Sequence, residues 1–379
     1  MPLHPWSDAR LPPAIAALRA YDPGHDLVAF RVRFGDRLIE VGSNENLLGP
    51  APAALAALAD PRQAAWRYPD PRGGALRAAL ARLHGLEPDG IVLGNGSHEI
   101  LMRIALAFAP AGAPVVFSRY GFAVFAIATA AAGARAVAVP ALPADHPQMP
   151  LGHDLEKLAG ACSADTRVLY LANPNNPTGT WFEPDALARL LDEVPSTTLV
   201  VVDEAYQEYQ PEAAARSALR LLARHRNLLV TRTFSKAYGL AGLRVGWAAG
   251  DAAVIAVLDR VRESFNVNGL AQAAATAALG DAGHVAAECA AAAAARSRLA
   301  GVLAGLGVAS LPSRCNFLLA DFGSAGRAAS VEQALGSTGV VVRPMAGYGL
   351  GERLRISLAP PAREAALAAA LAEAVATPG

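Results

Sequence analysis

Cysteine is scarce in this sequence of 379 residues, and charges of the two signs balance. The three cysteines, Cys162, Cys289 and Cys315, are scattered, odd in number and without a CxxC spacing. This pattern argues against a disulfide framework and against a zinc site, so we expect no metal. The 33 basic residues are matched by 33 acidic ones. A chain without a basic excess lacks the usual mark of a nucleic-acid or membrane-surface partner.

Long hydrophobic runs are also missing. The longest stretch of low polarity, residues 122–134, ends at Arg135 and is too short to cross a bilayer. Residues 1–10 have no apolar core of the kind found in signal peptides. We therefore expect a cytoplasmic protein without a membrane partner.

Length predicts two domains, and composition favours helices packed on a buried sheet. Hydrophobic residues make up 53% of the chain, which suits helices packed on a buried sheet, and the chain is too long for one ordinary core. Residues 1–45 contain turn-forming Pro and Gly pairs and are expected to form an arm that joins the smaller domain. In residues 46–268, apolar strands alternate with helical stretches, which predicts a large domain with a mostly parallel sheet flanked by helices. Residues 269–379 are expected to form a smaller α+β domain.

Polar side chains follow three of the predicted strands. Asp203, Asn176 and Lys236 each come shortly after a run of Val and Leu residues. Open α/β sheets place their ligands at the carboxyl ends of parallel strands. These three side chains are therefore expected to converge on one crevice.

Together with two further residues, they match the needs of a pyridoxal phosphate enzyme. Lys236 offers an amine for the cofactor's aldehyde, and Asp203 offers an anion for the ring nitrogen. Asn176 and Tyr206 offer donors for the ring oxygen, and Arg244 offers a cation for the phosphate. The cofactor stabilises the carbanion that forms when an amino acid loses its α-proton. A carboxylate beside the ring nitrogen favours the protonated ring, which is the better electron acceptor.

A glycine-rich turn at residues 94–97 (GNGS) follows a predicted strand and precedes an apolar helical pattern. Its backbone N–H groups can approach an anion at a helix N-terminus. Because the helix dipole supplies only ~0.3–1 kcal/mol, Thr233, Ser235 and Arg244 would be needed to complete a phosphate site. A dinucleotide fingerprint is a competing interpretation, but Glu99 stands at the third glycine position and no acidic residue follows at the distance needed for a ribose. A plain strand-to-helix turn is the other alternative.

The stretch from Thr233 to Gly246 (TFSKAYGLAGLRVG) resembles the lysine segment of class II aminotransferases, and specifically that of the histidinol-phosphate aminotransferase branch. The resemblance implies fold type I of the pyridoxal phosphate-dependent transferases and pyridoxal 5'-phosphate as the cofactor. Further segments that resemble this branch run along most of the chain: Asn44-Glu45-Asn46, Arg67-Tyr68-Pro69-Asp70, Gly94-Asn95-Gly96-Ser97, residues 173–179, Phe265-Asn266-Val267-Asn268 and residues 342–349.

The resemblance also implies roles at the cofactor site. Tyr120 matches an aromatic ring on the cofactor face, with a core or rim tyrosine as the alternative. Tyr68 resembles the tyrosine that reaches the neighbouring subunit's cofactor phosphate, which implies a homodimer with a shared active site; a simple turn tyrosine is the alternative. His98 stands where the family usually has an acidic or amide residue, and it could alter the charge near the phosphate, cap the helix or be a surface variation. The expected cofactor-binding set is Gly96, Ser97, His98, Tyr120, Asn176, Asp203, Tyr206, Thr233, Ser235, Lys236, Arg244 and Tyr68, with Lys236 catalytic.

The substrate site is implied in the same way. Arg355 looks like the arginine that clamps a substrate carboxylate through two parallel hydrogen bonds, with a solvated charge at a strand edge as the alternative. Arg343 resembles the family arginine near the substrate side chain, and Tyr21 and Asn95 are candidates for the same pocket. After Arg355, the segment Leu358-Ala359-Pro360 departs from the family's glycine-containing continuation, which could reshape this pocket.

By resemblance, the expected reaction joins a small-molecule amino donor and a 2-oxo acid: L-histidinol phosphate and 2-oxoglutarate give imidazole-acetol phosphate and glutamate, in histidine biosynthesis. This donor has no α-carboxylate, so Arg355 would bind its phosphate and, in the second half-reaction, a carboxylate. The alternatives are an aromatic or broad-range amino-acid aminotransferase, a pyridoxal phosphate-dependent decarboxylase of a phosphorylated amino acid, and a catalytically silent cofactor-binding protein.

Overall fold

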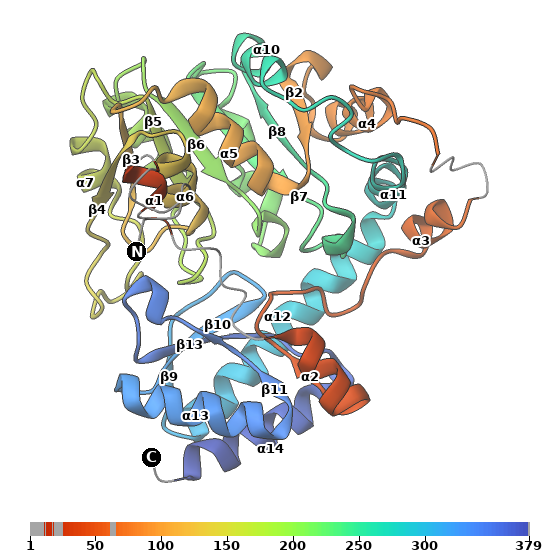
Figure 1. The fold of residues 1–379 in the computed structure, drawn as a ribbon, viewed down its shortest axis with the longest axis vertical. Helices are drawn as coiled ribbons and strands as arrows, with labels where there is room; N and C mark the ends of the chain where they lie inside the picture. Colours follow the sequence, from red (N-terminus) through yellow and green to blue (C-terminus); the bar gives the residue numbers. More distant parts are fainter. Residues whose placement is uncertain (1–10, 12, 17, 19–25, 61–65, 378–379) are drawn as a thin grey trace, which may run out of the picture.

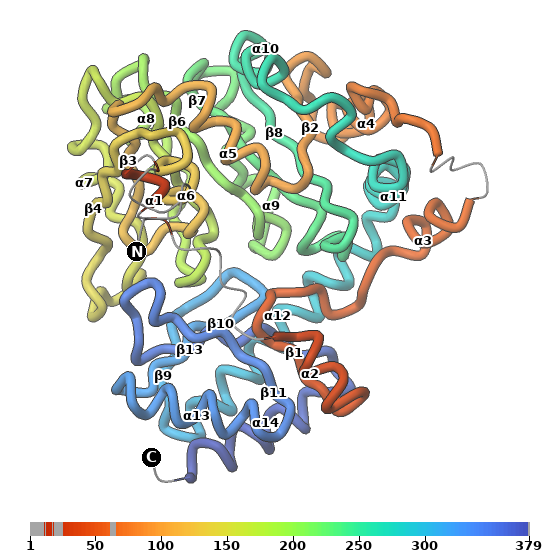
Figure 2. Tube along the Cα trace, in the orientation of Figure 1, coloured from red at the N-terminus to blue at the C-terminus, as the bar shows by residue number. Residues whose placement is uncertain are grey.

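The computed structural model describes residues 11, 13–16, 18, 26–60 and 66–377. Their elements form two parts, a larger one around a seven-stranded sheet and a smaller one below it in Figure 1. The chain passes between the parts along the segment that joins β1 to α3 and again along the long helix α12 (Ala282–Gly305), as Figure 2 shows. Among the described residues, no helix is both long and apolar enough to cross a membrane.

The larger sheet has the strand order β2-β8-β7-β6-β5-β3-β4. The pairs from β7 to β4 are parallel, whereas β8 runs antiparallel to both of its neighbours. A mostly parallel sheet was expected from the Val and Leu runs, because strands buried on both faces read as continuous apolar sequence. The strands are β2 (Ile91–Gly94), β3 (Pro114–Ser118), β4 (Arg135–Val139), β5 (Val168–Ala172), β6 (Leu199–Asp203), β7 (Leu228–Thr233) and β8 (Gly246–Gly250).

Helices cover both faces of this sheet. Successive residues of a strand point to opposite faces: Val201 packs in the cluster formed with α5 and α6, while Val200 and Val202 pack in the cluster formed with α7 and α8. The helices of the larger part are α1 (Pro13–Ala16), α3 (Pro52–Leu58), α4 (Gly74–His84), α5 (Gly96–Phe108), α6 (Val124–Ala131), α7 (Leu155–Gly160), α8 (Pro184–Glu193), α9 (Ala213–Arg216), α10 (Ala252–Arg260) and α11 (Gly269–Leu279).

The smaller part joins the C-terminal quarter of the chain to the segment around residue 40. Its four-stranded antiparallel sheet has the order β12-β13-β10-β9, and β1 pairs in parallel with β11. The elements are α2 (Leu27–Phe34), β1 (Ile39–Glu40), β9 (Ala309–Ser310), β10 (Phe317–Asp321), α13 (Ala325–Thr338), β11 (Val340–Val341), β12 (Arg343–Pro344), β13 (Arg353–Ser357) and α14 (Pro361–Ala376).

The division into residues 1–45, 46–268 and 269–379 stays a prediction, and the packing of α11 favours a later boundary. α11 contacts α3 and α4. Its small side chains Ala271 and Ala275 are buried in one cluster with Leu93 and Trp247 of the larger sheet. We therefore place the boundary near residue 280, just before α12.

Candidate active site

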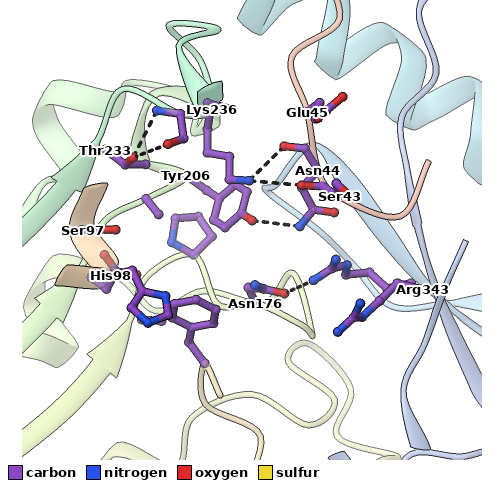
Figure 3. Close-up of a pocket in the computed structure, with 18 of the residues that line it drawn as sticks. Ser43, Asn44, Glu45, Ser97, His98, Asn176, Tyr206, Thr233, Lys236 and Arg343 are labelled. Carbon is purple, nitrogen blue, oxygen red and sulfur yellow. Dashed lines mark hydrogen bonds between the residues drawn. The ribbon is translucent and has the colours of Figure 1, made fainter. Parts of the chain in front are cut away.

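A cavity of about 410 Å³ lies at the carboxyl ends of β5, β6 and β7, where the two parts of the molecule meet. Eleven of the residues expected at the site line it: Ser97, His98, Asn176, Asp203, Tyr206, Thr233, Ser235, Lys236, Arg244, Arg343 and Arg355. Figure 3 shows several of them pointing inward from opposite sides.

Lys236 follows β7, and its side chain is held by the segment that joins β1 to α3. Its Nζ donates hydrogen bonds to the carbonyl oxygens of Ser43 and Asn44, at 3.3 and 3.1 Å (Figure 3). Burial lowers the pKa of Lys236 to about 8, and the nearby guanidinium groups of Arg355 and Arg244 act in the same direction. A desolvated lysine beside other cations is an activated nucleophile, because more of its amine is neutral near neutral pH.

Asp203 is the last residue of β6 and is almost fully buried. Its Oδ1 accepts a hydrogen bond from Thr231 Oγ1 on β7 at 2.7 Å. Burial raises the pKa of Asp203 to about 7, and the Thr231 hydrogen bond offsets part of that rise. A cation next to this carboxylate would favour its charged form, so the position suits a protonated ring nitrogen.

Tyr206 and Asn176 are tied to groups on the other side of the cavity. The Tyr206 hydroxyl accepts a hydrogen bond from Asn44 Nδ2 at 2.8 Å, and burial raises the pKa of Tyr206 above its ordinary value. Asn176 Oδ1 accepts from Arg355 Nη1 at 2.6 Å, while Arg355 Nη2 donates to the Gly42 carbonyl at 2.6 Å. These contacts connect the large sheet to the smaller part.

Two arginines stand side by side on the smaller part. Arg343 of β12 and Arg355 of β13 are direct partners in the antiparallel register, and both line the cavity. Guanidinium groups match the paired oxygens of carboxylates and phosphates. This wall of the cavity therefore suits an anionic substrate group.

The start of α5 and the loop after β7 form a third wall. Gly96 has a φ of +78°, which residues other than glycine rarely adopt, and a Cβ on it would lie 2.6 Å from Arg244 Nη2 and displace that guanidinium. Arg244 Nη1 reaches Ser235 Oγ at 3.4 Å, and Thr233 Oγ1 donates to Ser235 Oγ at 2.9 Å. Hydroxyls, a guanidinium and a helix N-terminus thus face the same space, as an anion-binding site requires.

His98 lines the cavity beside this wall (Figure 3). Burial lowers the pKa of His98, and the nearby Arg244 lowers it further. The ring is therefore more readily neutral than an exposed histidine. A functional role for His98 stays a prediction.

Some expected residues do not line the cavity. Tyr120 packs against a cluster that includes Leu151 and Met345, and Phe122, two residues later, lines the cavity instead. The stacking role of Tyr120 stays a prediction. Asn95 precedes α5 and its backbone N–H donates to the Glu99 carboxylate, so it acts as a helix-end residue here.

Tyr68 does not line the cavity of a single chain. The Tyr68 side chain is 82% exposed and stacks on Phe265, with ring centroids 4.5 Å apart. Tyr21 lies outside the residues that the structure describes. Exposure of Tyr68 is compatible with a reach into a second subunit, which stays a prediction.

Sequence reasoning missed the roles of Ser43, Asn44 and Glu45, which also line the cavity. Asn44 adopts a left-handed φ of 56°, its N–H donates to Ser357 Oγ at 2.9 Å, and its amide reaches Tyr206. The only signal in the sequence was that the segment Asn44-Glu45-Asn46 resembles the corresponding segment of the family. Its contact with Lys236, about 190 residues later in the sequence, follows only from the fold.

The model of the family described as aminotransferase class I and II matches residues 36–374. The chain therefore belongs to this family of enzymes.

Within it, the chain is similar to proteins named histidinol-phosphate aminotransferase. The one from Thiobacillus denitrificans is 44% identical over 97% of this chain and 94% of its own length. The one from Ralstonia nicotianae is 43% identical over 96% of this chain and 97% of its own length. The crystal structure of histidinol-phosphate aminotransferase from Sinorhizobium meliloti in complex with pyridoxal-5'-phosphate superimposes on this chain with a TM-score of 0.86. It is 35% identical in sequence, and the match covers 97% of this chain and 98% of that one.

These matches confirm the resemblance, the fold class and the aminotransferase prediction, and they support pyridoxal phosphate as the cofactor. The residues present also fit this cofactor. One amine, one buried carboxylate, an amide, a tyrosine hydroxyl and an anion-binding wall with Arg244 face one cavity. The individual residue roles remain predictions.

Replacing Gly96 by alanine should weaken cofactor binding by about tenfold or more, since each ~1.4 kcal/mol is a factor of ten. The new Cβ would meet Arg244 Nη2 at 2.6 Å, and a non-glycine residue at this φ adds strain of order 1–3 kcal/mol. The measurement is a titration of the cofactor-free protein with pyridoxal phosphate, followed by absorbance.

Gly242→Ala is the matched control, because a Cβ at Gly242 meets nothing within 4 Å and the residue lies in the same loop as Arg244. Equal affinities of the two variants would show that the close approach of Gly96 to Arg244 does not matter for the cofactor.

Proposed function

We propose that this chain transfers the amino group of L-histidinol phosphate to 2-oxoglutarate, giving imidazole-acetol phosphate and glutamate. The observation that carries the proposal is the pair Arg343 and Arg355 on adjacent strands of the cavity that also contains Lys236 and Asp203. This arrangement joins an anion-binding wall to groups suited to the cofactor. The 44% identity to a histidinol-phosphate aminotransferase over nearly the whole chain supports it.

Bound pyridoxal phosphate supplies an electron sink for the carbanion that remains when the amino substrate loses its α-proton. In this proposal Lys236 holds the cofactor covalently. When its amine is released, it moves the substrate's α-proton, a contribution of typically ~10²–10⁴-fold for a positioned acid–base group. The lowered pKa of Lys236, about 8, favours the neutral amine that this step needs. Asp203 stabilises a protonated ring nitrogen, and Arg244 with the Gly96 turn binds the phosphate.

Arg355 and Arg343 orient the reactants. The Arg355 guanidinium is fixed by hydrogen bonds to Asn176 Oδ1 and the Gly42 carbonyl, both at 2.6 Å. A guanidinium can bind either the phosphate of the amino donor or a carboxylate of the 2-oxo acid, because both groups present paired oxygens. One arginine can therefore serve both halves of the reaction.

The test is the absorbance spectrum of the purified protein before and after addition of histidinol phosphate, with phenylalanine as a parallel donor. We expect a visible band from the lysine-bound cofactor that histidinol phosphate bleaches and phenylalanine does not. Bleaching by phenylalanine alone would instead assign an aromatic amino-acid aminotransferase. No visible band after addition of pyridoxal phosphate would contradict the role of Lys236.

The proposal includes a cytoplasmic homodimer in which Tyr68 of one subunit completes the site of the other. Its exposed ring, supported by Phe265, is the feature that favours this arrangement. Variants Tyr68→Ala and Lys236→Ala should each be impaired. When they are mixed and refolded together, activity should recover, because each mixed dimer contains one site with both residues intact.

The control is each variant refolded alone, which should stay impaired. If the mixture is no more active than the sum of the separate variants, Tyr68 acts within its own chain or not at all.

A further inference from the structure

The segment from Gly42 to Pro50, here called the crossing segment, passes directly beside Lys236. The carbonyls of Ser43 and Asn44 accept hydrogen bonds from Lys236 Nζ. Asn46 Nδ2 donates to the backbone carbonyls of Lys236 and Ala237, each at 3.0 Å. The crossing segment therefore contacts both the side chain and the backbone of the lysine.

The crossing segment is in turn anchored by the long helix α12. The carboxylate of Glu288 accepts hydrogen bonds from the backbone N–H groups of Leu47, at 3.2 Å, and Leu48, at 3.1 Å. The same carboxylate also accepts a hydrogen bond from the Tyr209 hydroxyl at 3.0 Å. One turn earlier on the helix, His284 Nε2 lies 2.9 Å from the Gly49 carbonyl oxygen.

Burial makes the Glu288 contacts strong. The residue has no exposed surface, and burial raises the pKa of Glu288, while the N–H groups of Leu47 and Leu48 and the Tyr209 hydroxyl lower it. A buried carboxylate that lost these donors would be left without solvation, which is costly. Hydrogen bonds to a charged acceptor are also roughly twice as strong as neutral ones. Two consecutive N–H groups of the crossing segment are thus fixed to α12.

We propose that Glu288 is a positioning residue for the amine of Lys236. By fixing the N–H groups of Leu47 and Leu48, it holds the carbonyls of Ser43 and Asn44 against Nζ. Glu288 does not itself line the cavity, so it acts through the crossing segment. The inference rests on the proposed role of Lys236, but its test reads the lysine directly and requires no turnover.

The expected effect on Lys236 has a definite sign. Two carbonyl acceptors stabilise an ammonium more than a neutral amine, so moving them away disfavours the charged form and lowers the pKa. The other groups that act on Lys236 electrostatically are Glu45, Arg244, Arg355 and Cys315, and Asp203 is coupled to it as well. None of them is changed in the variants proposed below.

The lysine content of the chain makes the measurement simple, because Lys157 and Lys236 are its only two lysines. The full-length protein, freed of cofactor, is trace-labelled with acetic anhydride over a range of pH, and the labelled peptides are quantified by mass spectrometry. Lys157, with a side chain 59% exposed, serves as an internal standard. We expect Glu288→Gln and Glu288→Asp to lower the pKa of Lys236 by about one pH unit, with Lys157 unchanged.

The two substitutions separate anchoring from charge. Glu288→Asp keeps the charge but shortens the side chain by one methylene, so a lowered pKa of Lys236 in this variant reports loss of the anchor. If Glu288→Gln does not fold, the aspartate variant decides alone. Hydrogen exchange at the amides of Leu47 and Leu48 should also become faster in a folded variant, since their carboxylate acceptor is lost or moved.

Tyr209→Phe is the matched control, because it removes one donor from the same carboxylate but leaves Leu47 and Leu48 in place. It should leave the pKa of Lys236 at the parent value. An unchanged or raised pKa of Lys236 in the Glu288 variants, or an equal decrease in Tyr209→Phe, would overturn the positioning role. The spectrum of the parent protein with histidinol phosphate tests the proposed function separately, so the two failures are distinguishable.

Discussion

Replacing Lys236 by alanine is expected to reduce transamination by at least ~10²–10⁴-fold, the usual contribution of a positioned acid–base group. In the proposed mechanism, the variant would lose both the covalent attachment of the cofactor and the amine that moves the α-proton. Asp203, Arg244 and the Gly96 turn remain, so pyridoxal phosphate should still bind without a covalent bond. The measurements are the initial rate of glutamate formation from histidinol phosphate and 2-oxoglutarate, and the spectrum of the bound cofactor.

Lys157→Ala is the control for this result. Lys157 lies on α7, is mostly exposed and pairs with Asp154 at 2.8 Å, and it does not line the cavity. Its replacement should leave the rate unchanged. Substantial turnover by Lys236→Ala would remove the basis for the assigned chemistry.

Replacing Arg232 by alanine should lower the free energy of unfolding by about 3–5 kcal/mol, because it leaves the buried carboxylate of Glu204 unpaired. Arg232 on β7 donates from Nε and Nη2 to Glu204 Oε2 at 3.0 and 2.8 Å. Its Nη2 also reaches Ser217 Oγ at 2.9 Å, and its Nη1 lies 3.5 Å from Glu208. Both Arg232 and Glu204 are buried. Urea denaturation of the variant and the parent measures the difference.

Arg226→Ala is the matched control, since Arg226 forms a comparable pair with Asp251 at 2.7 Å but is exposed to solvent. Solvent-exposed pairs contribute little, so this variant should stay close to the parent. Equal losses in the two variants would mean that burial of the Arg232–Glu204 pair is not what stabilises the protein.

The strands and the polar residues at their ends were predictable because their signals are local. The run before Asp203 is continuous Val and Leu, as in a strand buried on both faces, and the first polar residue after it falls at the strand's carboxyl end. The same reasoning predicted that Lys236 and Asn176 would meet Asp203, and all three line one cavity.

What could not be predicted depends on long-range packing. Tyr120 and Phe122 follow the same strand, and only the path of the loop decides which ring faces the cavity. Glu288 lies in an Ala-rich helix whose sequence gives no sign that its carboxylate binds a segment about 240 residues earlier. Nothing in the sequence pairs Arg232 with Glu204, and only the fold places the two side chains together.

The cavity takes its chemical groups from regions of the chain that are separate in the sequence. Lys236 and Asp203 come from the larger part, whereas Arg343 and Arg355 come from short strands of the smaller part. Under the residue roles proposed above, mutations in those short strands would change which anion is accepted without altering the residues proposed to bind the cofactor. Such a separation would let a duplicated gene acquire a new substrate through changes near its 3′ end, while the chemistry of the cofactor is inherited unchanged.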